Sequence, residues 1–488
     1  MHSRAIIATL ALLVAAGTVH ATDVSGPQFG TWTLANSPYV LVGDVTVPAG
    51  ERLTIEPGVV VRGRGLFKLV VNGELQAVGT AGQPILMTAE VPATGWRGMK
   101  FERAADISRL EYCIVEYAKG TGAYPEVRGG GVIILECSPT VAYCELRYNY
   151  SHNGNYNGVG GGILTETSNA RIRHNYIHHN EADSGAGICC TEYGTPVLAD
   201  NRITDNTAFY AGGGIYMGAR SSPLVERNVI LRNAAGGWGG GGINSWTSFI
   251  FYGTFPTIRD NVIAKNVSTS GGAAQGGGGI YCRYDKAVIS NNTIADNQAV
   301  QGGGIYVVCY PAQAPEVTSS IIWGNTASAA PQIGLEASTG AEIWVNYSDV
   351  QGGWTGTGNL DLPPAFVNPA GDDYHLTGGS PCINTGDPAH FAPAERDIDG
   401  QIRDWNTPGG APRLVDMGAD EFGAAVPGDC NCDGRVNFDD INWFVLALTD
   451  PAGYGTALPT CNPITADVNS DGVVNFDDIN PFVAALSG

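Results

Sequence analysis

The residues best suited to chemistry lie in two acidic stretches near the end of the chain. "DCNCDGRVNFDD" occupies residues 429–440, and "DVNSDGVVNFDD" occupies residues 467–478. Side chains with oxygen atoms stand at positions 1, 3, 5, 9 and 12 of each stretch, and glycine stands at position 6. A loop that wraps a Ca²⁺ ion uses oxygen ligands at these positions, a backbone carbonyl at position 7 and glycine at the sharp turn. The two stretches therefore predict two calcium sites.

Six oxygen ligands are predicted for each stretch. They are Asp429, Asn431, Asp433, the backbone carbonyl of Arg435, Asn437 and Asp440 in the first stretch, and Asp467, Asn469, Asp471, the backbone carbonyl of Val473, Asn475 and Asp478 in the second. Gly434 and Gly472 stand at the turn position. The apolar segments "INWFVLAL" and "INPFVAAL" follow the two stretches, so one short helix is expected after each loop.

Two cysteines interrupt the first stretch and have no counterpart in the second. Cys430 and Cys432 occupy positions 2 and 4, which supply no ligand to the ion. A thiolate site for a soft metal would need more cysteine or histidine nearby. The pair is therefore interpreted as structural, and Cys461 is the expected disulfide partner of one of the two.

The paired loop–helix units, with no helix before either loop, resemble the dockerin modules that attach secreted enzymes to cohesin-bearing assemblies. Asn at position 9 and Asp at position 12 fit that family. The resemblance implies a small α-helical, EF-hand-like module over residues 426–488, which binds two calcium ions and docks on a cohesin-like protein or a cell-surface receptor. Positions 10 and 11 depart from the family, because Phe438-Asp439 and Phe476-Asp477 replace small hydroxyl residues. A calcium-stabilised end tag stays open as the alternative.

A repeat fills the middle of the chain and must position everything else. The form N-x-I-x-x-N recurs in "NYIHHN" (175–180), "NRITDN" (201–206), "NVILRN" (228–233), "NVIAKN" (261–266) and "NTIADN" (292–297). It alternates with glycine-rich segments that end at Ile188, Ile215, Ile243, Ile280 and Ile305, spaced by 25 to 28 residues except for 37 between Ile243 and Ile280. Strands this short bury an apolar face only when successive coils stack, with asparagine side chains in a ladder at one turn and glycine at another. The pattern predicts a parallel β-solenoid.

This repeat is similar to that of the right-handed parallel β-helix proteins, which have the pectin-lyase-like fold. The resemblance covers roughly residues 40–350 and implies an all-β, right-handed parallel β-helix over residues 22–350. It identifies no reaction, because the fold carries lyases, hydrolases, epimerases, adhesins and inert modules.

The repeat fades after residue 350. An open solenoid end exposes unpaired strand edges, so residues 351–425 are expected to form a cap and a linker. The alternative is a metal site made from the acidic residues of this segment, which are Asp397, Asp399, Asp416, Asp420 and Glu421.

Charged residues fall in columns when the coils are aligned. Opposite charges meet on neighbouring coils at Asp205 and Arg232, Lys265 and Asp296, Asp200 and Arg227, and Arg227 and Asp260. Opposite charges on adjacent strands modestly stabilise a sheet. The columns therefore predict ladders of ion pairs on a solvated face.

The 37-residue coil offers the candidate binding surface. Extra length in a solenoid forms a loop on one side, and this one, "NSWTSFIFYGTFPT", is rich in aromatic residues. Trp238, Trp246, Tyr252 and Tyr281 are the predicted sugar contacts, because exposed aromatic rings stack on sugar rings. Buried rings that only anchor the loop are the alternative.

The next coil carries the candidate catalytic residues, Arg283, Asp285 and Lys286. β-Helix polysaccharide lyases use an Arg or Lys base beside a cation that neutralises a uronate carboxylate, so this role is what the resemblance implies. Three solvated charges on a turn are the alternative. The Asp-rich motifs of β-helix polygalacturonases and the Asp-Pro-His-Asp motif of alginate epimerases are absent from the sequence.

Residues 1–21 have the form of a signal peptide, with His2 and Arg4 before an apolar run and a small-residue cleavage site that ends at Ala21. The mature protein is therefore expected to be secreted, either extracellular or held at the cell surface. No later segment contains the roughly 20 apolar residues of a membrane span.

A net charge of −21 argues against nucleic acid as a partner. Among the eleven cysteines, Cys113 and Cys144 occupy matching places in two coils, where they are either stacked neighbours or a disulfide.

Two functions remain open from the sequence. The fold and the dockerin resemblance favour a secreted carbohydrate-associated protein, with a polysaccharide lyase or glycoside hydrolase as its enzymatic form. The generic repeats and the missing catalytic motifs favour a noncatalytic surface or adhesion protein whose calcium-binding tail serves attachment or stability.

Overall fold

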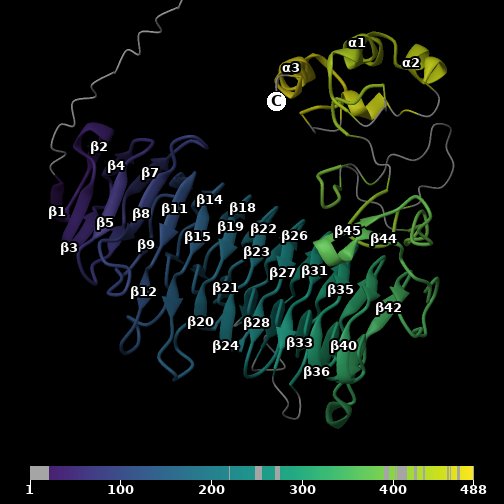
Figure 1. Ribbon diagram of the computed structural model, residues 1–488, viewed down its shortest axis with the longest axis horizontal. Coiled ribbons are helices and arrows are strands. Elements are labelled where there is room, and N and C mark those ends of the chain that lie inside the picture. The colour runs from purple at the N-terminus through teal and green to yellow at the C-terminus, as the bar shows by residue number, and fades with distance from the viewer. Residues whose placement is uncertain are drawn as a thin grey trace, which may run out of the picture.

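The computed structural model describes residues 21–218, 220–247, 255–269, 275–389, 395–401, 403, 415–422, 426–431, 435–458, 461, 463–469 and 473–486. Most of this chain is a parallel β-solenoid of about ten turns (Figure 1). The predicted leader, residues 1–21, lies outside the described residues except for its last residue, so it stays a prediction.

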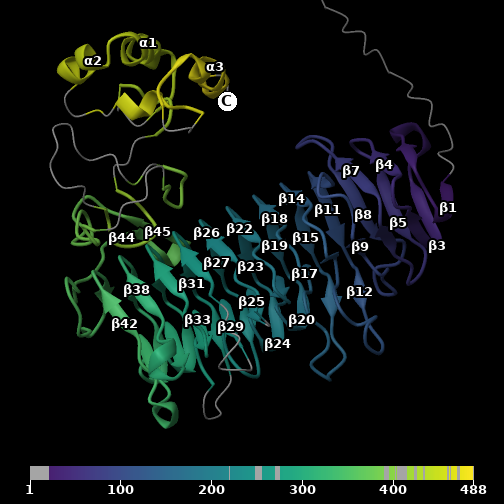
Figure 2. The same ribbon diagram turned by 180° about the vertical axis from the view of Figure 1, so that it is seen from behind.

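The strands of the solenoid form three sheets, and all the strand pairings within these sheets are parallel. A 12-stranded sheet runs along the whole solenoid (Figure 2). Its strands are β2 (Gly30–Trp32), β4 (Arg52–Ile55), β7 (Glu74–Val78), β10 (Arg109–Glu111), β14 (Thr140–Ala142), β18 (Arg171–Arg173), β22 (Val197–Ala199), β26 (Leu224–Glu226), β30 (Thr257–Arg259), β34 (Val288–Ser290), β38 (Glu316–Thr318) and β42 (Trp344–Asn346).

An 8-stranded sheet begins farther along the chain. Its strands are β12 (Lys119–Gly120), β16 (Tyr150–Ser151), β20 (Glu181–Ser184), β24 (Thr207–Ala211), β28 (Ala234–Ala235), β32 (Val267–Ser268), β36 (Gln298–Gln301) and β40 (Thr326–Ala329). The remaining solenoid strands belong to a 23-stranded sheet with two rows, which meet at the N-terminal end because β3 pairs with both β5 and β6.

The first row passes through β11 (Cys113–Glu116), β15 (Glu145–Arg147), β19 (Tyr176–His178), β23 (Arg202–Thr204), β27 (Val229–Leu231), β31 (Val262–Ala264), β35 (Thr293–Ala295), β39 (Ile321–Trp323) and β43 (Asp349–Val350). The second row passes through β13 (Val132–Leu135), β17 (Ile163–Glu166), β21 (Ile188–Thr191), β25 (Ile215–Gly218), β29 (Ile243–Trp246), β33 (Ile280–Arg283), β37 (Ile305–Val308) and β41 (Ile333–Leu335). The N-terminal strands of the sheet are β1 (Thr22–Pro27), β3 (Tyr39–Val47), β5 (Val60–Gly63), β6 (Leu69–Val71), β8 (Ile85–Ala89) and β9 (Met99–Glu102).

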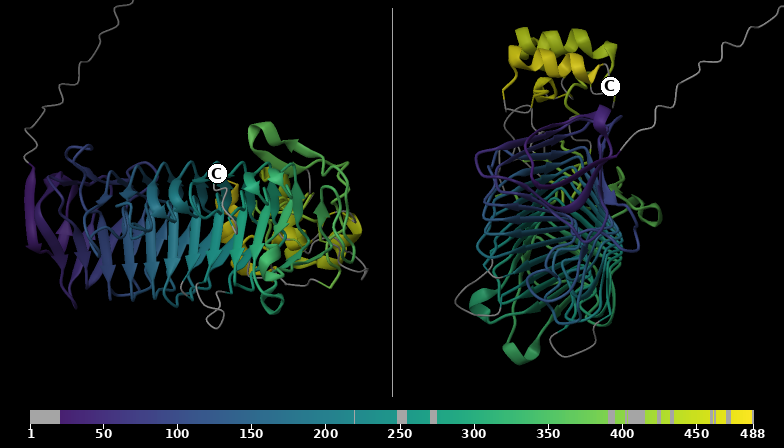
Figure 3. Two further views of the ribbon diagram at one scale, coloured as in Figure 1. Left: turned by 90° about the horizontal axis from the view of Figure 1, so that it is seen from below. Right: turned by 90° about the vertical axis from the view of Figure 1, so that its left-hand side faces the viewer.

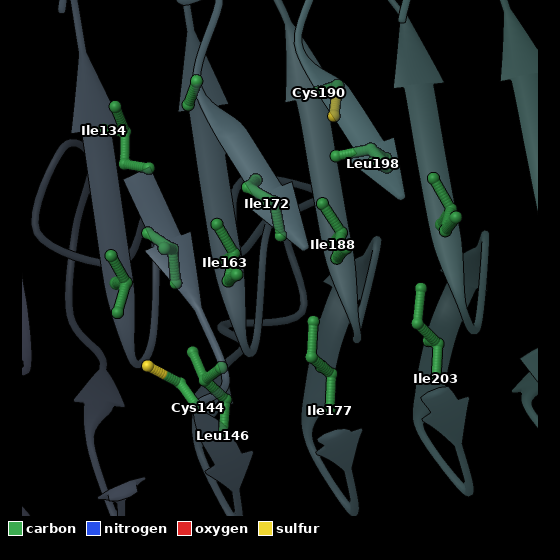
Figure 4. Close-up of a cluster of buried hydrophobic side chains, with 14 of the residues drawn as sticks. Ile134, Cys144, Leu146, Ile163, Ile172, Ile177, Ile188, Cys190, Leu198 and Ile203 are labelled. Atoms are coloured by element: carbon green, nitrogen blue, oxygen red, sulfur yellow. The ribbon is translucent and has the colours of Figure 1, made fainter. Parts of the chain in front are cut away.

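The core lies inside the coils, where one apolar side chain stacks on the next. In the second row Ile163, Ile188 and Ile215 are aligned across neighbouring strands and fully buried. Figure 4 shows Ile163 and Ile188 in the same orientation on successive coils, and Ile177 and Ile203 likewise. The coils stack along the solenoid (Figure 3). From β11 onward the strands of the first row pair in parallel without register slips, so each inward position lies above the same position of the next coil. The predicted parallel β-solenoid with inward isoleucines is confirmed.

Two ladders of buried asparagines flank the first row of strands and confirm the predicted amide ladder. In one link, the Asn233 Oδ1 accepts the backbone N–H of Asn206 at 3.0 Å and its Nδ2–H at 2.9 Å. The Nδ2 of Asn233 donates in turn to the carbonyl of Ile203 at 2.9 Å. One ladder runs through Asn149, Asn180, Asn206, Asn233, Asn266, Asn297 and Asn325, and the other through Asn175, Asn201, Asn228, Asn261 and Asn292.

Cys113 and Cys144 occupy the positions that asparagine takes in the later coils. Their coils pair in register through β11 and β15, and both thiols are buried and free. The Sγ of Cys144 donates to the carbonyl of Leu110 at 3.3 Å, and Cys113 donates to that of Glu111 at 3.3 Å. Of the two alternatives for this pair, the stacked neighbours are therefore correct.

The glycine-rich turns bring coils closer together than a side chain would allow. Gly277 has a φ of +74°, which favours glycine. At Gly278 a Cβ would lie 2.5 Å from the carbonyl oxygen of Gly303 in the next coil. The recurring glycines thus serve both the turn and the stacking distance.

The residues after the solenoid cover two different surfaces, its last coil and one outer face. Residues 352–360 lie on the last coil, where the carbonyl of Ser348 accepts the N–H of Leu360 at 2.9 Å. Beyond Asn292, the ladder continues through the hydroxyls of Ser320 and Ser348. It reaches Asn359, which accepts the N–H of Ser348 at 3.0 Å. The described residues between 366 and 422, called the flank segment below, cover the outer face of strands β27, β31, β35 and β39. They include the antiparallel pair β44 (Phe366–Asn368) and β45 (Asp373–Leu376) (Figure 1).

Arg403 joins the flank segment to the solenoid. Its side chain is almost completely buried, and its Nε donates to Asp260 Oδ1 at 2.7 Å. Its Nη2 donates to the carbonyls of Gly418 and Ala419 at 2.9 and 2.7 Å. A buried charge is stable only when it is paired and hydrogen-bonded, so this side chain fixes where the flank segment sits.

The flank segment changes two of the predicted ion pairs. Arg227 pairs with Asp200 at 2.8 Å and Arg232 pairs with Asp205 at 3.1 Å, as expected. Lys265 instead pairs with Asp372 at 2.7 Å, and Asp296 accepts the hydroxyl of Tyr374 at 2.8 Å. Asp260 binds Arg403 rather than Arg227. The prediction of a fully solvated face is wrong for these coils, because a later segment covers it.

The C-terminal module contains three α-helices, α1 (Ile441–Thr449), α2 (Pro451–Ala457) and α3 (Ile479–Ala485). Helices α1 and α3 follow the two acidic stretches as predicted, whereas α2 was not predicted (Figure 1). The 3₁₀ helices are η1 (Leu34–Asn36), η2 (Pro311–Gln313), η3 (Ala337–Thr339), η4 (Pro369–Gly371), η5 (Phe438–Asp440), η6 (Pro463–Ala466) and η7 (Phe476–Asp478). Among the described residues no helix is both long and apolar enough to cross a membrane.

Replacing Asn233 with alanine is expected to lower the free energy of unfolding by about 2–5 kcal/mol, because two buried N–H groups of Asn206 and the carbonyl of Ile203 lose their partner. Urea denaturation measures the loss. Asn155→Ala, at an exposed turn, is the matched control and should change stability by less than about 0.5 kcal/mol. Equal effects of the two substitutions would contradict the structural role of the ladder.

Candidate functional site

A cluster of aromatic rings marks the outer side of the second row of strands. The rings of Trp238 and Trp246 have centroids 5.4 Å apart at an angle of 62°. Tyr156 stacks on Trp238 at 5.0 Å, and Tyr210 lies 5.8 Å from the same ring. Both tryptophans are half-buried, and Tyr156 is exposed. We call these four residues the aromatic site.

The register of the solenoid explains why Trp246 faces outward here. Gly218, Trp246 and Arg283 are aligned as the last residues of β25, β29 and β33. The missing side chain of Gly218 leaves room for the Tyr216 ring, since a Cβ there would lie 2.8 Å from that ring. The guanidinium of Arg283 lies 5.6 Å from the Trp246 ring and 5.2 Å from the Tyr284 ring, which suits cation–π attraction.

Three buried polar atoms beside the aromatic site lack a hydrogen-bond partner among the described residues. They are the Oδ1 of Asn244, the Nε1 of Trp246 and the Nε of Arg283. The Nδ2 of Asn244 is satisfied, because it donates to the carbonyl of Gly239 at 3.0 Å. Leaving such an atom unpaired costs roughly 1–3 kcal/mol. Because these three atoms are buried, an ordered water is the partner that would satisfy them without a change in the structure.

The structure brings together two of the four predicted sugar contacts. Trp238 and Trp246 meet in the aromatic site. Tyr281 is buried and stacks on Tyr306 at 6.2 Å, in the position of a packing residue. Tyr252 lies outside the described residues.

The three candidate catalytic residues have three different environments. Arg283 lies on the outer face against Trp246, and Lys286 is exposed. Asp285 is buried beside Ser245 and Cys282, and Cys282 belongs to the hydrophobic core of the solenoid. Their grouping as a catalytic set stays a prediction.

Burial raises the pKa of Asp285 to about 7. One carboxylate oxygen accepts the backbone N–H of Ala287 at 3.3 Å, and the other has no hydrogen-bond partner within the described part of the chain. Near neutral pH this side chain can thus hold a proton inside the solenoid.

Sequence reasoning missed Tyr156, Tyr210 and Tyr216, which belong to earlier coils than the long one. Each precedes or begins a second-row strand, so a comparison of aromatic residues across aligned coils would have grouped them with the tryptophans. The aromatic site is assembled by stacking, and a single stretch of sequence does not contain it.

The two acidic stretches have the same local geometry where they are described. Asp440 accepts the backbone N–H of Asn431 at 3.0 Å and that of Asn437 at 2.8 Å. Asp478 does the same with Asn469 and Asn475, each at 2.9 Å. The carboxylates at loop positions 1 and 12, Asp429, Asp440, Asp467 and Asp478, are all buried. Asp433 and Asp471, with Gly434 and Gly472, lie outside the described residues.

An apolar face joins the two halves of the C-terminal module. The rings of Phe444 in α1 and Phe482 in α3 stack at 4.1 Å, beneath a groove of about 290 Å³ with apolar walls. Phe438 and Phe476, at position 10 of each stretch, are 74% and 75% exposed. Exposed rings at equivalent places on a duplicated unit form an interaction surface more readily than a core.

The cysteines of this module behave as structural residues. Cys461 is disulfide-bonded, whereas Cys430 carries a free, buried thiol and is not its partner. Cys432 lies outside the described residues. Burial raises the pKa of Cys430 to about 12, so its thiol is unreactive.

The acidic residues of the flank segment include one group with metal-ligand spacing. His375, Asp399 and Asp420 each place a ligand atom within 4.8 Å of the others. The Nε2 of His375 lies 3.0 Å from Asp399, and Nδ1 lies 2.6 Å from Asp373. These carboxylates, Asp399 first, raise the pKa of His375 to about 10. A protonated histidine between carboxylates accounts for the cluster as a set of ion pairs.

Comparison with known proteins identifies the repeat. Residues 98–278 match the family model described as a right handed beta helix region. No curated protein matches the chain. Together with the parallel pairing of the coils, the match shows that this is a β-helix repeat protein with a right-handed β-helix region.

Asp285→Asn is expected to weaken the pH dependence of stability. The folded-state pKa of about 7 lies above the ordinary 3.8, so the native chain loses stability as pH rises from about 4 through 7, while the variant lacks this loss. Between pH 4.5 and 8 the variant should gain about 1–4 kcal/mol relative to the native chain in urea denaturation.

Asp106→Asn is the control for this experiment, because Asp106 is exposed and the amide can still accept the N–H of Ser138. Its stability should follow that of the native chain at each pH. Parallel curves for Asp285→Asn and the native chain would contradict a carboxyl that holds its proton in the fold.

Proposed function

We propose that the protein binds carbohydrate at the aromatic site. The observation that carries the proposal is the pair of half-buried tryptophans, Trp238 and Trp246, together with the rings of Tyr156 and Tyr210. The apolar faces of sugar rings stack on aromatic rings. A ligand of this class would therefore stack on these rings, and Arg283 at the edge of Trp246 would face its polar groups.

The proposal concerns binding and leaves turnover to experiment. Arg283 stands at the site and could contact an acidic group of a glycan, while Asp285 lies inside the solenoid. The polysaccharide lyase or hydrolase remains the enzymatic form of the proposal, and a noncatalytic surface or adhesion protein is the alternative. The enzymatic and the noncatalytic protein would use the same binding site. Only the enzymatic one would release a product from the polysaccharide.

The C-terminal module, we further propose, is a calcium-dependent, dockerin-like attachment module of an exported protein. Each acidic stretch would hold one Ca²⁺ through its six predicted ligands, and the two ions would offset the charge of the four buried carboxylates. The exposed Phe438 and Phe476 support a docking role for this face. The partner would be a cohesin-like protein or a cell-surface receptor. The signal peptide predicted from the sequence supports a secreted protein that is extracellular or held at the cell surface.

Trp246→Ala and Trp238→Ala are each expected to weaken binding of a responsive polysaccharide by roughly tenfold, because one stacked ring contributes about 1–3 kcal/mol. Affinity electrophoresis or calorimetry on a panel of neutral and acidic polysaccharides measures the effect. Trp344→Ala is the matched control, since Trp344 is 57% exposed at the far end of the solenoid. Unchanged binding in both site variants would reject the aromatic site.

The same incubations are followed for unsaturated products and new reducing ends. Unsaturated product identifies a lyase, and reducing ends alone identify a hydrolase. Binding without either product supports the noncatalytic form.

Asp440→Asn together with Asp478→Asn is expected to weaken calcium binding by more than about tenfold, because each substitution removes a charged ligand. Calorimetry on the full chain measures the affinity. Chelation should lower the helical circular dichroism signal of the C-terminal module while the β-sheet signal remains.

Asp439→Asn with Asp477→Asn is the control, since these side chains are exposed and outside the predicted ligand set. A native chain that binds no calcium, or control and test variants with equal affinity, would overturn the proposed metal sites.

A further inference from the structure

A second cavity lies on the N-terminal half of the solenoid and reaches as far as β17, the strand that follows Tyr156 of the aromatic site. It has a volume of about 160 Å³ and an apolar floor made by Ile133, Leu135 and Leu164. Four of the chain's 26 basic residues line it: Lys68, Arg97, Lys100 and Arg128. We call it the cationic groove. This concentration of positive charge is notable in a chain whose net charge is −21.

The four cations face three carboxylates. Arg97 and Lys68 lie 2.8 and 3.4 Å from Glu126. Lys100 pairs with Glu102 at 2.9 Å, and Arg128 forms an ion pair with Glu166. The groove therefore keeps one more positive than negative charge, and Glu126 is shared by two of the cations.

Glu126 has the most exposed side chain among the groove's charged groups. Its side chain is 47% exposed, whereas those of Arg97 and Lys68 are 22% and 27% exposed. Glu126 also belongs to the connection between β12 and β13, whereas Lys68 and Arg97 lie just before β6 and β9 on neighbouring coils. An exposed ion pair contributes only about 0–1 kcal/mol, so exchange of this carboxylate for another costs little. The partly buried cations, by contrast, attract an anion more strongly than fully solvated ones would.

We propose that the cationic groove binds a small organic carboxylate, and that the Glu126 side chain occupies the position of its carboxylate until a ligand arrives. The ligand's carboxylate lies between Lys68 and Arg97, and its remaining atoms rest on the floor formed by Ile133 and Leu164. Tyr124 stands at the rim, with the Arg128 guanidinium 5.8 Å from its ring. The volume fits a single acid, or one acidic unit of a longer molecule, rather than a drug-sized ligand.

The test titrates the full native chain with D-glucuronate, glutarate and D-glucose by calorimetry. Both acids should bind and glucose should not, because the carboxylate is the recognised group. Binding of glucuronate without glutarate would assign the site to acidic sugars, and binding of glutarate alone to simple diacids; either result supports the carboxylate proposal. Equal responses to glucose and glucuronate, or no binding of either acid, would overturn it.

Variants separate the groove from general charge effects. Glu126→Gln should raise the affinity for the bound acid at least threefold, because the internal competitor and its charge are removed. Arg97→Gln, with Lys68→Gln as a second variant, should lower it about tenfold. Glu136→Gln is the matched control, since Glu136 is an exposed carboxylate that pairs with Arg103 on neighbouring coils, outside the groove. Equal gains in Glu126→Gln and Glu136→Gln would reject a competing role for Glu126.

Discussion

The buried asparagine ladders are the constraint on which the rest of the structure depends. A turn inside a solenoid places peptide groups where water cannot reach them, and a buried peptide group without a partner is costly. Each ladder asparagine supplies the acceptor that the preceding coil needs and itself requires one from the next coil. Every coil must therefore follow the path of its neighbour. The aligned isoleucines and the close glycine turns are consequences of that shared path.

A uniform interior leaves variation to the outer faces, and both candidate binding sites lie there. In the aromatic site, rings from several coils meet because the register aligns the ends of their strands. In the cationic groove, the pairing of β6 with β9 sets Lys68, just before β6, near Arg97, just before β9, and near Lys100 in β9. Each candidate site is thus built on the outer face of the solenoid, and neighbouring coils each contribute one or two side chains to it.

Much of this architecture was predictable from sequence. The spacing of Asn175, Asn201 and Asn228 indicated the length of the repeating coil. The stacking of Ile188 on Ile215 could be predicted from that length. The position of the flank segment was not predictable, because it depends on Arg403 reaching Asp260 across 143 residues of sequence. The candidate site was predicted in part: Trp238 and Trp246 come from one aromatic-rich stretch, whereas Tyr156 and Tyr210 reach them only through stacking. The burial of Asp285 was not predicted. The alternation of inward and outward residues along β33 ends at Arg283, so it does not indicate which way the side chains of the following turn face.

The flank segment limits how a protein of this kind can grow. A coil that copies its neighbour satisfies the ladder on both sides, so duplication of a coil leaves no unpaired group in the interior. The flank segment, however, contacts Arg232, Asp260, Thr293 and Ser319, which lie on four successive coils. An added coil within that span would move the contacts on its two sides apart by one coil, whereas one added before Asn201 would leave their relative positions unchanged. Over evolution the N-terminal half can lengthen by duplication, and the C-terminal half is held at its present number of coils.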